Sequence, residues 1–129
     1  MIPERYAPGV YAAFRIVFGF LFLLHGLQKF GLVGGMEVPF FGAGPIGAAK
    51  AIEPICGVLI MLGLFTRPAA FIASGQMAVA YFIVHQPMGG LPVQNGGELA
   101  VHYCFAFLYI AARGSGPASV DAMMQRPKR

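Results

Sequence analysis

The stretch LGLFTRPAA, residues 62–70, separates two long apolar runs and decides how the chain is expected to fold. Thr66 is expected to cap the helix that follows it, and Pro68 is typical of the first turn of a helix. So few residues are left for the connection that the two flanking helices should be antiparallel neighbours.

Outward from this turn, the apolar segments predict four helices and a polar tail, at residues 9–30, 47–65, 68–85, 97–113 and 114–129. A helix that spans a membrane needs about 20 residues. The second and fourth segments reach that length only if their polar first turns lie at membrane depth. We therefore expect one transmembrane domain, residues 1–129, with an all-α fold: a four-transmembrane-helix bundle with antiparallel neighbours.

The composition favours a membrane as the solvent. The chain is 57% hydrophobic and 11% charged, whereas soluble domains have about 25% charged residues. Its net charge of +4 is carried largely by the termini, which argues against nucleic acid as a partner because phosphate binding needs basic residues gathered on one folded face. The lipid bilayer is the expected partner.

Local sequence features argue against a cleaved signal peptide and against a metal site. A cleaved signal peptide is not expected, because Arg15 interrupts the first apolar run and no small-x-small site follows Leu24. Cys56 and Cys104 are isolated and form no metal-binding spacing, so no metal site is expected. Two buried inert thiols are the favoured reading, and a redox role is the alternative.

The distribution of basic residues predicts the orientation in the membrane. Arg5, Arg67 and Arg113 fall on one side of a four-span chain, together with the basic end of the tail. The only charged residue in the loops on the other side is Glu37. Lys and Arg are enriched on the cytoplasmic side, so a multi-pass protein with both termini in the cytoplasm is expected.

The candidates for one binding pocket are polar side chains near the non-cytoplasmic ends of the segments, His25, Gln28, Lys29, Glu53, Glu98 and His102, and two on helix faces expected to point into the bundle, Gln76 and Tyr109. Helical periodicity places Glu98, His102 and Tyr109 on one face. A charge at the bilayer centre costs about 2.5–3.5 kcal/mol, which favours inward placement. We expect Lys29 or Lys50 to pair with Glu53 or Glu98. No residue is assigned a catalytic role.

Other readings of these residues stay open at this point. The lysines and Arg15 fit side chains that extend to the head groups, and Glu98 fits a helix cap. His25 and His102 fit a structural hydrogen-bonded pair or two haem ligands. His85 fits an interfacial residue.

Four long motifs give the chain a family resemblance: FLFLLHGLQKFG (20–31), GLFTRPAA (63–70), MAVAYFIVHQPMGG (77–90) and NGGELAVHYCFAFLYIAARGSGPASVDA (95–122). In these motifs the chain resembles the DoxX family of small bacterial membrane proteins, over roughly residues 8–122. The resemblance implies a four-helix protein of the bacterial inner membrane that acts as an oxidoreductase component. Some relatives are linked to thiosulfate:quinone oxidoreductase. The family motif HGxQK corresponds to residues 25–29, and NGGE corresponds to residues 95–98.

The polar candidates are compatible with quinone chemistry, because quinone carbonyls need hydrogen-bond donors and quinone reduction needs protons. No flavin, nucleotide, iron–sulfur or dithiol motif is evident, so a redox partner protein is expected to supply any electrons. Whether the chain is itself an enzyme stays open. The alternative function is a non-enzymatic module that binds lipid or a small solute, transports, or assists assembly.

Overall fold

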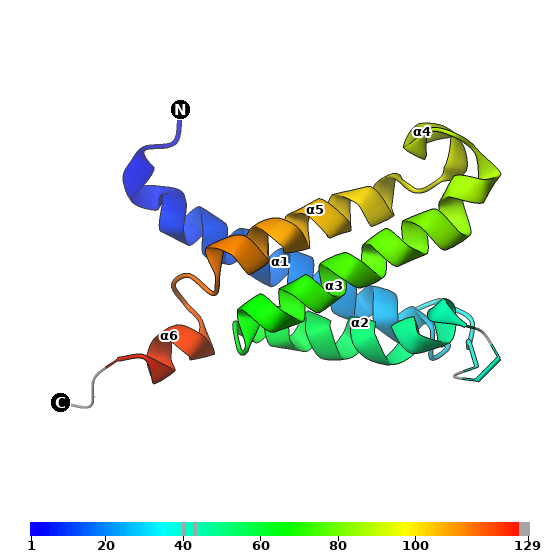
Figure 1. The fold of residues 1–129 in the computed structure, drawn as a ribbon. Coiled ribbons are helices and arrows are strands. Elements are labelled where there is room, and N and C mark those ends of the chain that lie inside the picture. The colour runs from blue at the N-terminus through cyan, green and yellow to red at the C-terminus, as the bar shows by residue number, and fades with distance from the viewer. Residues whose placement is uncertain (40, 43, 127–129) are drawn as a thin grey trace.

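The computed structural model describes residues 1–39, 41–42 and 44–126, and these residues form helices and no strand (Figure 1). The all-helical prediction is therefore confirmed for the described chain. The four long helices are α1 (Ala7–Gln28), α2 (Pro45–Leu62), α3 (Thr66–Ala80) and α5 (Glu98–Arg113). Two short helices, α4 (Pro92–Asn95) and α6 (Val120–Met124), were not predicted. The end of the predicted tail, residues 127–129, lies outside the described residues.

Three helical segments of the described chain are long and apolar enough to cross a membrane: Glu4–Gln28, Pro45–Leu62 and Thr66–Met88. The first and third include the short turns that extend α1 and α3. Helix α5 has 16 residues and is shorter than these three. The chain is thus a membrane protein with several apolar helices.

The connection between α2 and α3 is as tight as expected, but its cap differs from the prediction. Gly63 ends α2 in the left-handed conformation with φ 69°, which suits glycine because it has no Cβ. Thr66 is the first residue of α3 and not its cap. The cap comes from far along the chain: Asp121 accepts hydrogen bonds from Phe65 N at 3.0 Å, Thr66 N at 3.1 Å and Thr66 Oγ1 at 2.9 Å.

Asp121 is thereby suited to remain ionised. Burial acts to raise the pKa of its carboxyl, but the hydrogen bonds from Thr66 and Phe65 and the charge of Arg15 outweigh burial and hold the pKa below its ordinary value. The Asp121 backbone N–H also donates to Gly63 O at 2.9 Å. The segment around α6 is therefore attached to the α2–α3 turn through both main chain and side chain.

Arg15 completes this end of the molecule. It is fully buried within α1 and donates to carbonyl oxygens at the end of α2, Ile60 at 2.8 Å and Met61 at 3.0 Å, and to Ala118 at 2.7 Å. The last carbonyls of a helix have no partner within it, and a guanidinium carries five donors that suit several acceptors. We call Arg15, Gly63, Thr66 and Asp121 the Arg15 cluster.

Helices α1 and α2 pack backbone against backbone. A Cβ added at Gly19 would lie 2.5 Å from Met61 N, and one at Gly57 would lie 2.5 Å from Leu23 N. Further along, a Cβ at Gly26 would overlap Pro54. Three glycines therefore hold the two helices closer than any side chain would allow, as small residues do between membrane helices.

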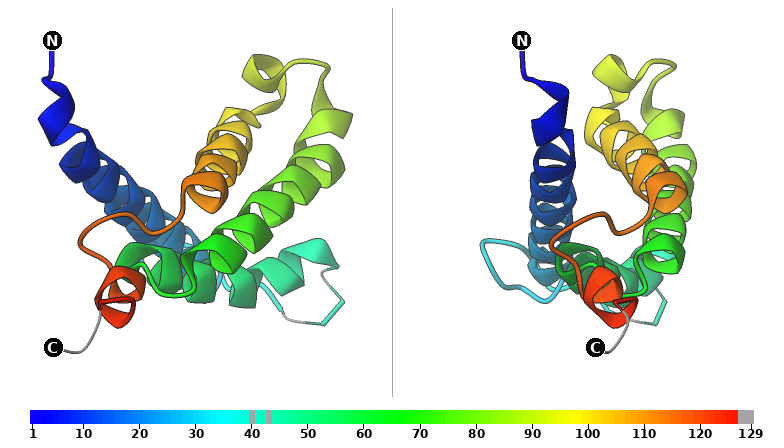
Figure 2. Two further views of the ribbon diagram at one scale, coloured as in Figure 1. Left: turned by 60° about the vertical axis from the view of Figure 1, so that its left-hand side comes forward. Right: turned by 90° about the vertical axis from the view of Figure 1, so that its left-hand side faces the viewer.

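The other helices do not pack closely against one another over their whole length. Helix α5 lies along α3. Helix α3 runs from the α2–α3 turn at an angle to α2, so that α3 and α2 diverge toward their far ends (Figures 1 and 2). Aromatic rings fill the space between α1 and α5, with Phe22 4.7 Å from Phe107 and 5.4 Å from Tyr103 between ring centroids. The N-terminus, α6 and the α2–α3 turn lie in the left half of Figure 1. The diverging end positions the candidate site.

Candidate functional site

A cavity of about 490 Å³ lies where α2 and α3 diverge, and the end of α1 and the start of α5 complete its wall. This volume falls within the range of about 300–1,000 Å³ typical of small-molecule sites. Most of its wall is aliphatic, and its polar residues are few. Of the sequence candidates, His25, Lys29, Glu53 and Gln76 line it.

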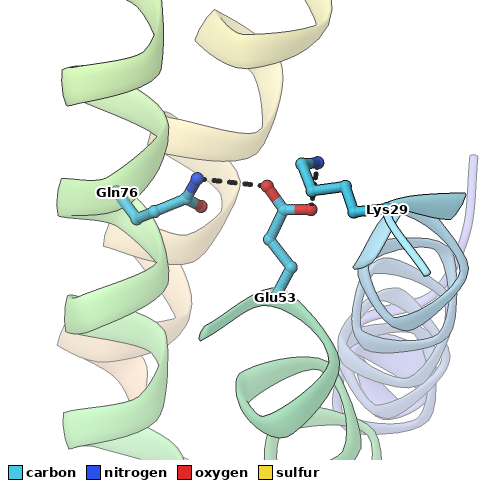
Figure 3. A network of polar contacts seen from close by, with 3 residues as sticks. All are labelled: Lys29, Glu53 and Gln76. Atoms are coloured by element: carbon cyan, nitrogen blue, oxygen red, sulfur yellow. Dashed lines mark hydrogen bonds and ion pairs between the residues drawn. The ribbon is translucent and has the colours of Figure 1, made fainter. Parts of the chain in front are cut away.

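Glu53 is the centre of the polar wall (Figure 3). Its side chain is only 1% exposed. Lys29 Nζ lies 2.6 Å from Glu53 Oε2, and Gln76 Nε2 donates to Glu53 Oε1 at 3.1 Å. Each carboxylate oxygen thus has its own partner, from α1 and from α3. We call Lys29, Glu53 and Gln76 the Glu53 cluster.

The close packing of α1 against α2 explains how Lys29 reaches Glu53. Gly26 lies against Pro54 and Glu53, where a Cβ would come within 3.0 Å of the Glu53 Cβ. Lys29 follows Gly26 by three residues, so both lie on the same face of the α1 end. Lys29 is 17% exposed, and it therefore connects the buried carboxylate with the surface at this end.

A π turn at the end of α3 brings His85, which was not a pocket candidate, into the cavity wall. Residues Tyr81–His85 continue α3 as a single π turn, a distortion often found at functional sites. His85 at its end lines the cavity. Its Nδ1 lies 3.3 Å from the carbonyl oxygen of Asn95. The sequence reading of His85 as an interfacial residue therefore missed its place in the wall.

Asn95 holds the loop that closes this end. It is buried, donates to Gly89 O at 2.9 Å and to Tyr81 Oη at 3.3 Å, and accepts from Gly97 N at 2.9 Å. The first residue of the NGGE motif therefore has a structural role in the α3–α5 loop. That loop sets the position of His85 and of the first turn of α5.

Tyr103 is the second residue that sequence reasoning missed. It is buried on α5, lines the cavity, and lies 6.3 Å from His25 between ring centroids. Its spacing from Ala100, Phe107 and Ile110 follows the helical period. That spacing was the available signal, but it marks the inward face of α5 only once the other helices are in place.

Four candidates lie away from the cavity wall, and their placement there was wrong: Gln28, Glu98, His102 and Tyr109. All four are exposed. Glu98, His102 and Tyr109 do share a face of α5, but the opposite face, with Tyr103 and Phe107, is buried. Inward placement failed because in a membrane both faces of a helix can be apolar, so polarity alone does not tell which face is buried.

The polar members of that outer face have local or neighbouring contacts. His102 Nδ1 lies 2.7 Å from the carbonyl oxygen of Glu98, one turn earlier. The Tyr109 ring lies 5.8 Å from Tyr11 and 6.1 Å from Phe14 between centroids. Because His25 lines the cavity and His102 is exposed, the alternative reading in which these two histidines pair, directly or through haem, is wrong.

Of the two lysine pairings, one is as expected and one is not. Lys29 pairs with Glu53, one of the pairs that we expected. Lys50 is buried and lies 3.5 Å from Glu37 Oε1 and 4.5 Å from the centre of the Phe30 ring. Glu98, which we had considered as a lysine partner, is exposed at the start of α5. The loop residue Glu37 takes that place because it lies beside Lys50 in the first half of α2.

Cys56 and Cys104 are free thiols. Cys56 is buried, and Cys104 Sγ lies 3.6 Å from Ser74 Oγ. Within the described ranges, no three histidine, cysteine or acidic side chains gather as a metal site would require.

The rim of the cavity is apolar and exposed. Ile46 of α2 and Ile72 and Val79 of α3 line it, and Ile72 is 51% exposed. The polar groups lie deeper, at Glu53 and Gln76. A ligand that fits both parts has a small polar head and an apolar tail.

Comparison with known proteins identifies relatives without a known activity. The DoxX family model matches residues 10–86. An uncharacterized protein of Haemophilus influenzae is 42% identical in an alignment 129 residues long, and the match covers 92% of this chain and 92% of that protein. A second uncharacterized protein of the same organism is 27% identical over 78 residues, covering 60% of this chain and 52% of that protein. No solved structure matches the chain significantly.

Proposed function

Because the chain belongs to the DoxX family of small membrane proteins, we propose that it is the membrane component of a quinone-linked oxidoreductase system. In this proposal the cavity beside Glu53 holds the quinone head group. A redox partner protein supplies the electrons. The observation that carries the proposal is the combination, in one cavity, of a buried hydrogen-bonding cluster and an exposed apolar rim.

The shape and chemistry of the cavity support a quinone in two ways. The apolar rim between Ile46 and Ile72 faces the lipid if α2 and α3 span the membrane, so an isoprenoid tail would remain among apolar groups. Lys29, His25 and Tyr103 carry N–H or O–H groups suited to the oxygens of the head group. Lys29 also offers a route for protons from the surface to Glu53.

The membrane arrangement is part of the proposal. Four spans with antiparallel neighbours, in the bacterial inner membrane and with both termini cytoplasmic, fit the basic residues at the α2–α3 turn and the end of α5. Helix α5 is short, but Ser74 Oγ of α3 donates to Cys104 O at 2.7 Å, so α5 lies at the depth of α3. Reporter fusions after Gly35 and Gly90 should be non-cytoplasmic, and a fusion after Arg113 cytoplasmic. A non-cytoplasmic reporter after Arg113 would contradict the four-span arrangement.

A binding experiment tests the function directly. The protein in lipid nanodiscs is titrated with decylubiquinone and with its reduced form, and saturable binding of either supports the proposal. Ala80→Phe places a ring in the cavity wall and should weaken binding at least about tenfold. Ala13→Phe on the exposed face of α1 adds the same ring outside the cavity and should have no effect.

The alternative function, a binder of lipid or a small solute, makes the opposite prediction in the same experiment. Mass spectrometry of protein purified in mild detergent would then show a retained phospholipid, and neither form of decylubiquinone would bind. The exposed apolar rim is the observation that fits this alternative, because it suits an acyl chain as well as an isoprenoid chain.

A further inference from the structure

The hydrogen bond to Glu53 fixes the orientation of the Gln76 amide in the cavity wall. Gln76 Nε2 lies 3.1 Å from Glu53 Oε1. A carboxylate only accepts hydrogen bonds, so the NH₂ end of the amide must point to Glu53 and the carbonyl end away from it. The opposite orientation would set two oxygens against each other. Figure 3 shows the Gln76 amide with its nitrogen toward Glu53.

The carbonyl end of Gln76 is left without a partner. Gln76 Oε1 is buried and accepts no hydrogen bond from the part of the chain that the structure describes. A buried acceptor without a donor is costly, and native structures contain few such atoms. Because Gln76 belongs to the cavity wall, a small rotation of its side chain would let a donor on a ligand reach this oxygen.

His85 adds a second acceptor to the wall. Its Nδ1 lies 3.3 Å from the carbonyl oxygen of Asn95, and a carbonyl oxygen only accepts, so Nδ1 carries the hydrogen. In the neutral imidazole the other nitrogen, Nε2, then accepts. His25 and Tyr103 adapt to either polarity. The Lys29 ammonium has three N–H donors, of which one is engaged by Glu53 at 2.6 Å, and the others suit an oxygen of either redox form, so Lys29 does not discriminate between them.

The two redox forms of a quinone differ in the polarity that they present. The carbonyl oxygens of a quinone only accept hydrogen bonds, whereas the hydroxyl groups of a quinol donate as well as accept. A quinone oxygen beside Gln76 Oε1 would place two acceptors together, and a quinol hydroxyl would supply the missing donor. We propose that the cavity prefers the quinol to the quinone, an inference that rests on the proposed function.

The test compares the two forms on one protein. Decylubiquinol and decylubiquinone are titrated anaerobically into nanodisc-embedded protein, and the quinol should bind at least about tenfold more tightly, the difference expected for one satisfied buried hydrogen bond. Equal affinities, or tighter binding of the quinone, would overturn the inference and leave the proposed function in place. Absence of binding by both forms would overturn the proposed function as well.

Two variants connect the preference to Gln76. In Gln76→Leu the oriented amide is gone, so the preference for the quinol should fall to within about threefold of equality. Gln28→Leu, at an exposed position of α1, is the matched control and should keep the wild-type preference. A Gln76→Leu protein that still favours the quinol tenfold would overturn the inference.

Glu53→Gln should shift the preference from the quinol toward the quinone. The amide of a glutamine at position 53 can donate to Gln76 Oε1, which allows the Gln76 amide to turn its NH₂ group toward the cavity. Tighter relative binding of decylubiquinone in this variant would support the role of Glu53 in orienting Gln76. An unchanged preference in a folded Glu53→Gln protein would contradict that role.

Discussion

The two ends of the molecule each hold a cation, the buried Arg15 and the partly buried Lys29, and they hold it differently. Arg15 donates to backbone carbonyls at the end of α2 and in the segment before α6. Lys29 contacts a side-chain carboxylate, which in turn accepts from Gln76 beside a cavity. Carbonyl groups of a helix end have one position and one protonation state. The side chains of the Glu53 cluster can rotate and exchange protons.

This difference suggests a division of roles. The Arg15 cluster joins α1, α2, α3 and the segment around α6, and Arg15 donates to carbonyls only. The buried Arg15 Nε also has no partner in the described part of the chain, but Arg15 does not line the cavity, so this cluster is suited to stability. The Glu53 cluster lines a cavity of about 490 Å³ and leaves one buried acceptor, Gln76 Oε1, without a partner within the described residues. It is therefore suited to binding. Four substitutions can break or sharpen this contrast.

The largest loss of stability is expected for Arg15→Met. The substitution leaves the carbonyl oxygens of Met61 and Ala118 without their Arg15 donor, whereas Ile60 O keeps a hydrogen bond from Gly63 N. Each unsatisfied buried group costs about 1–3 kcal/mol. The free energy of unfolding in detergent should fall by about 3 kcal/mol or more. Arg5→Met, at an exposed residue, is the control. Equal thermal unfolding of the two variants would show that the Arg15 cluster does not stabilise the fold.

A smaller loss is expected for Glu53→Gln. Removing one partner of a fully buried ion pair costs about 3–5 kcal/mol, and partial exposure of Lys29 should reduce this to about 2 kcal/mol. Adding Lys29→Met should recover part of the loss, because the unpaired ammonium is then gone. Glu98→Gln, at an exposed residue, should change thermal unfolding by no more than about 0.5 kcal/mol. If Glu98→Gln were the more harmful change, our description of the ion pair would be wrong.

Gly57→Ala tests the packing that connects the two ends. The new methyl group would overlap Leu23 N and Gly19 O, so α1 and α2 must separate, at a cost of about 1–3 kcal/mol. Gly75→Ala is the matched control, because a Cβ on this α3 residue meets nothing within 4 Å and alanine favours the helix by up to about 1 kcal/mol. Chemical denaturation should therefore rank Gly57→Ala below the wild type and Gly75→Ala at or above it.

The smallest effect is expected for Asp121→Asn, with a dependence on pH. Loss of a capping carboxylate costs about 1 kcal/mol. The pKa of Asp121 is lower in the folded protein than in the unfolded chain, so its contribution is complete above the unfolded value of about 3.9 and is lost as the pH falls through the folded value. The wild type and Asp121→Asn should differ in unfolding temperature at pH 7 and converge in acid. A constant difference down to pH 2 would contradict this.

The sequence predicted the parts of the fold that depend on local chemistry. The tight connection between α2 and α3 and the apolar helices around it follow from the short distance between two apolar runs and from Pro68 in the first turn of α3, although the prediction that Thr66 caps α3 was wrong. The pairing of Lys29 with Glu53 was among the expected pairs because the sequence placed Lys29 at the end of the first apolar segment and Glu53 near the start of the second, although the structure has Glu53 in the middle of α2. The capping of Thr66 by Asp121 was not predictable, because the two residues are 55 positions apart.

The candidate site was predicted less completely, for two physical reasons. A π turn adds a residue to the local period, so His85 lies on a face that counting at 100° per residue does not give. Helix α5 is apolar on its buried and exposed faces alike, so the alignment of Glu98 with His102 did not reveal that their face points outward. Half of the predicted site residues therefore line the cavity and half do not.

The attachment of Asp121 to the α2–α3 turn has a consequence for the order of events during synthesis. Residues 1–113, which contain all four long helices, leave the ribosome before Asp121 does. Until then, Thr66 lacks its acceptor and Arg15 lacks the carbonyl of Ala118. Nascent chains that stop short of residue 121 can insert their helices and yet cannot complete this end. Assembly is thus completed only after the last long helix, α5, has been made, and a truncated chain leaves these groups unsatisfied.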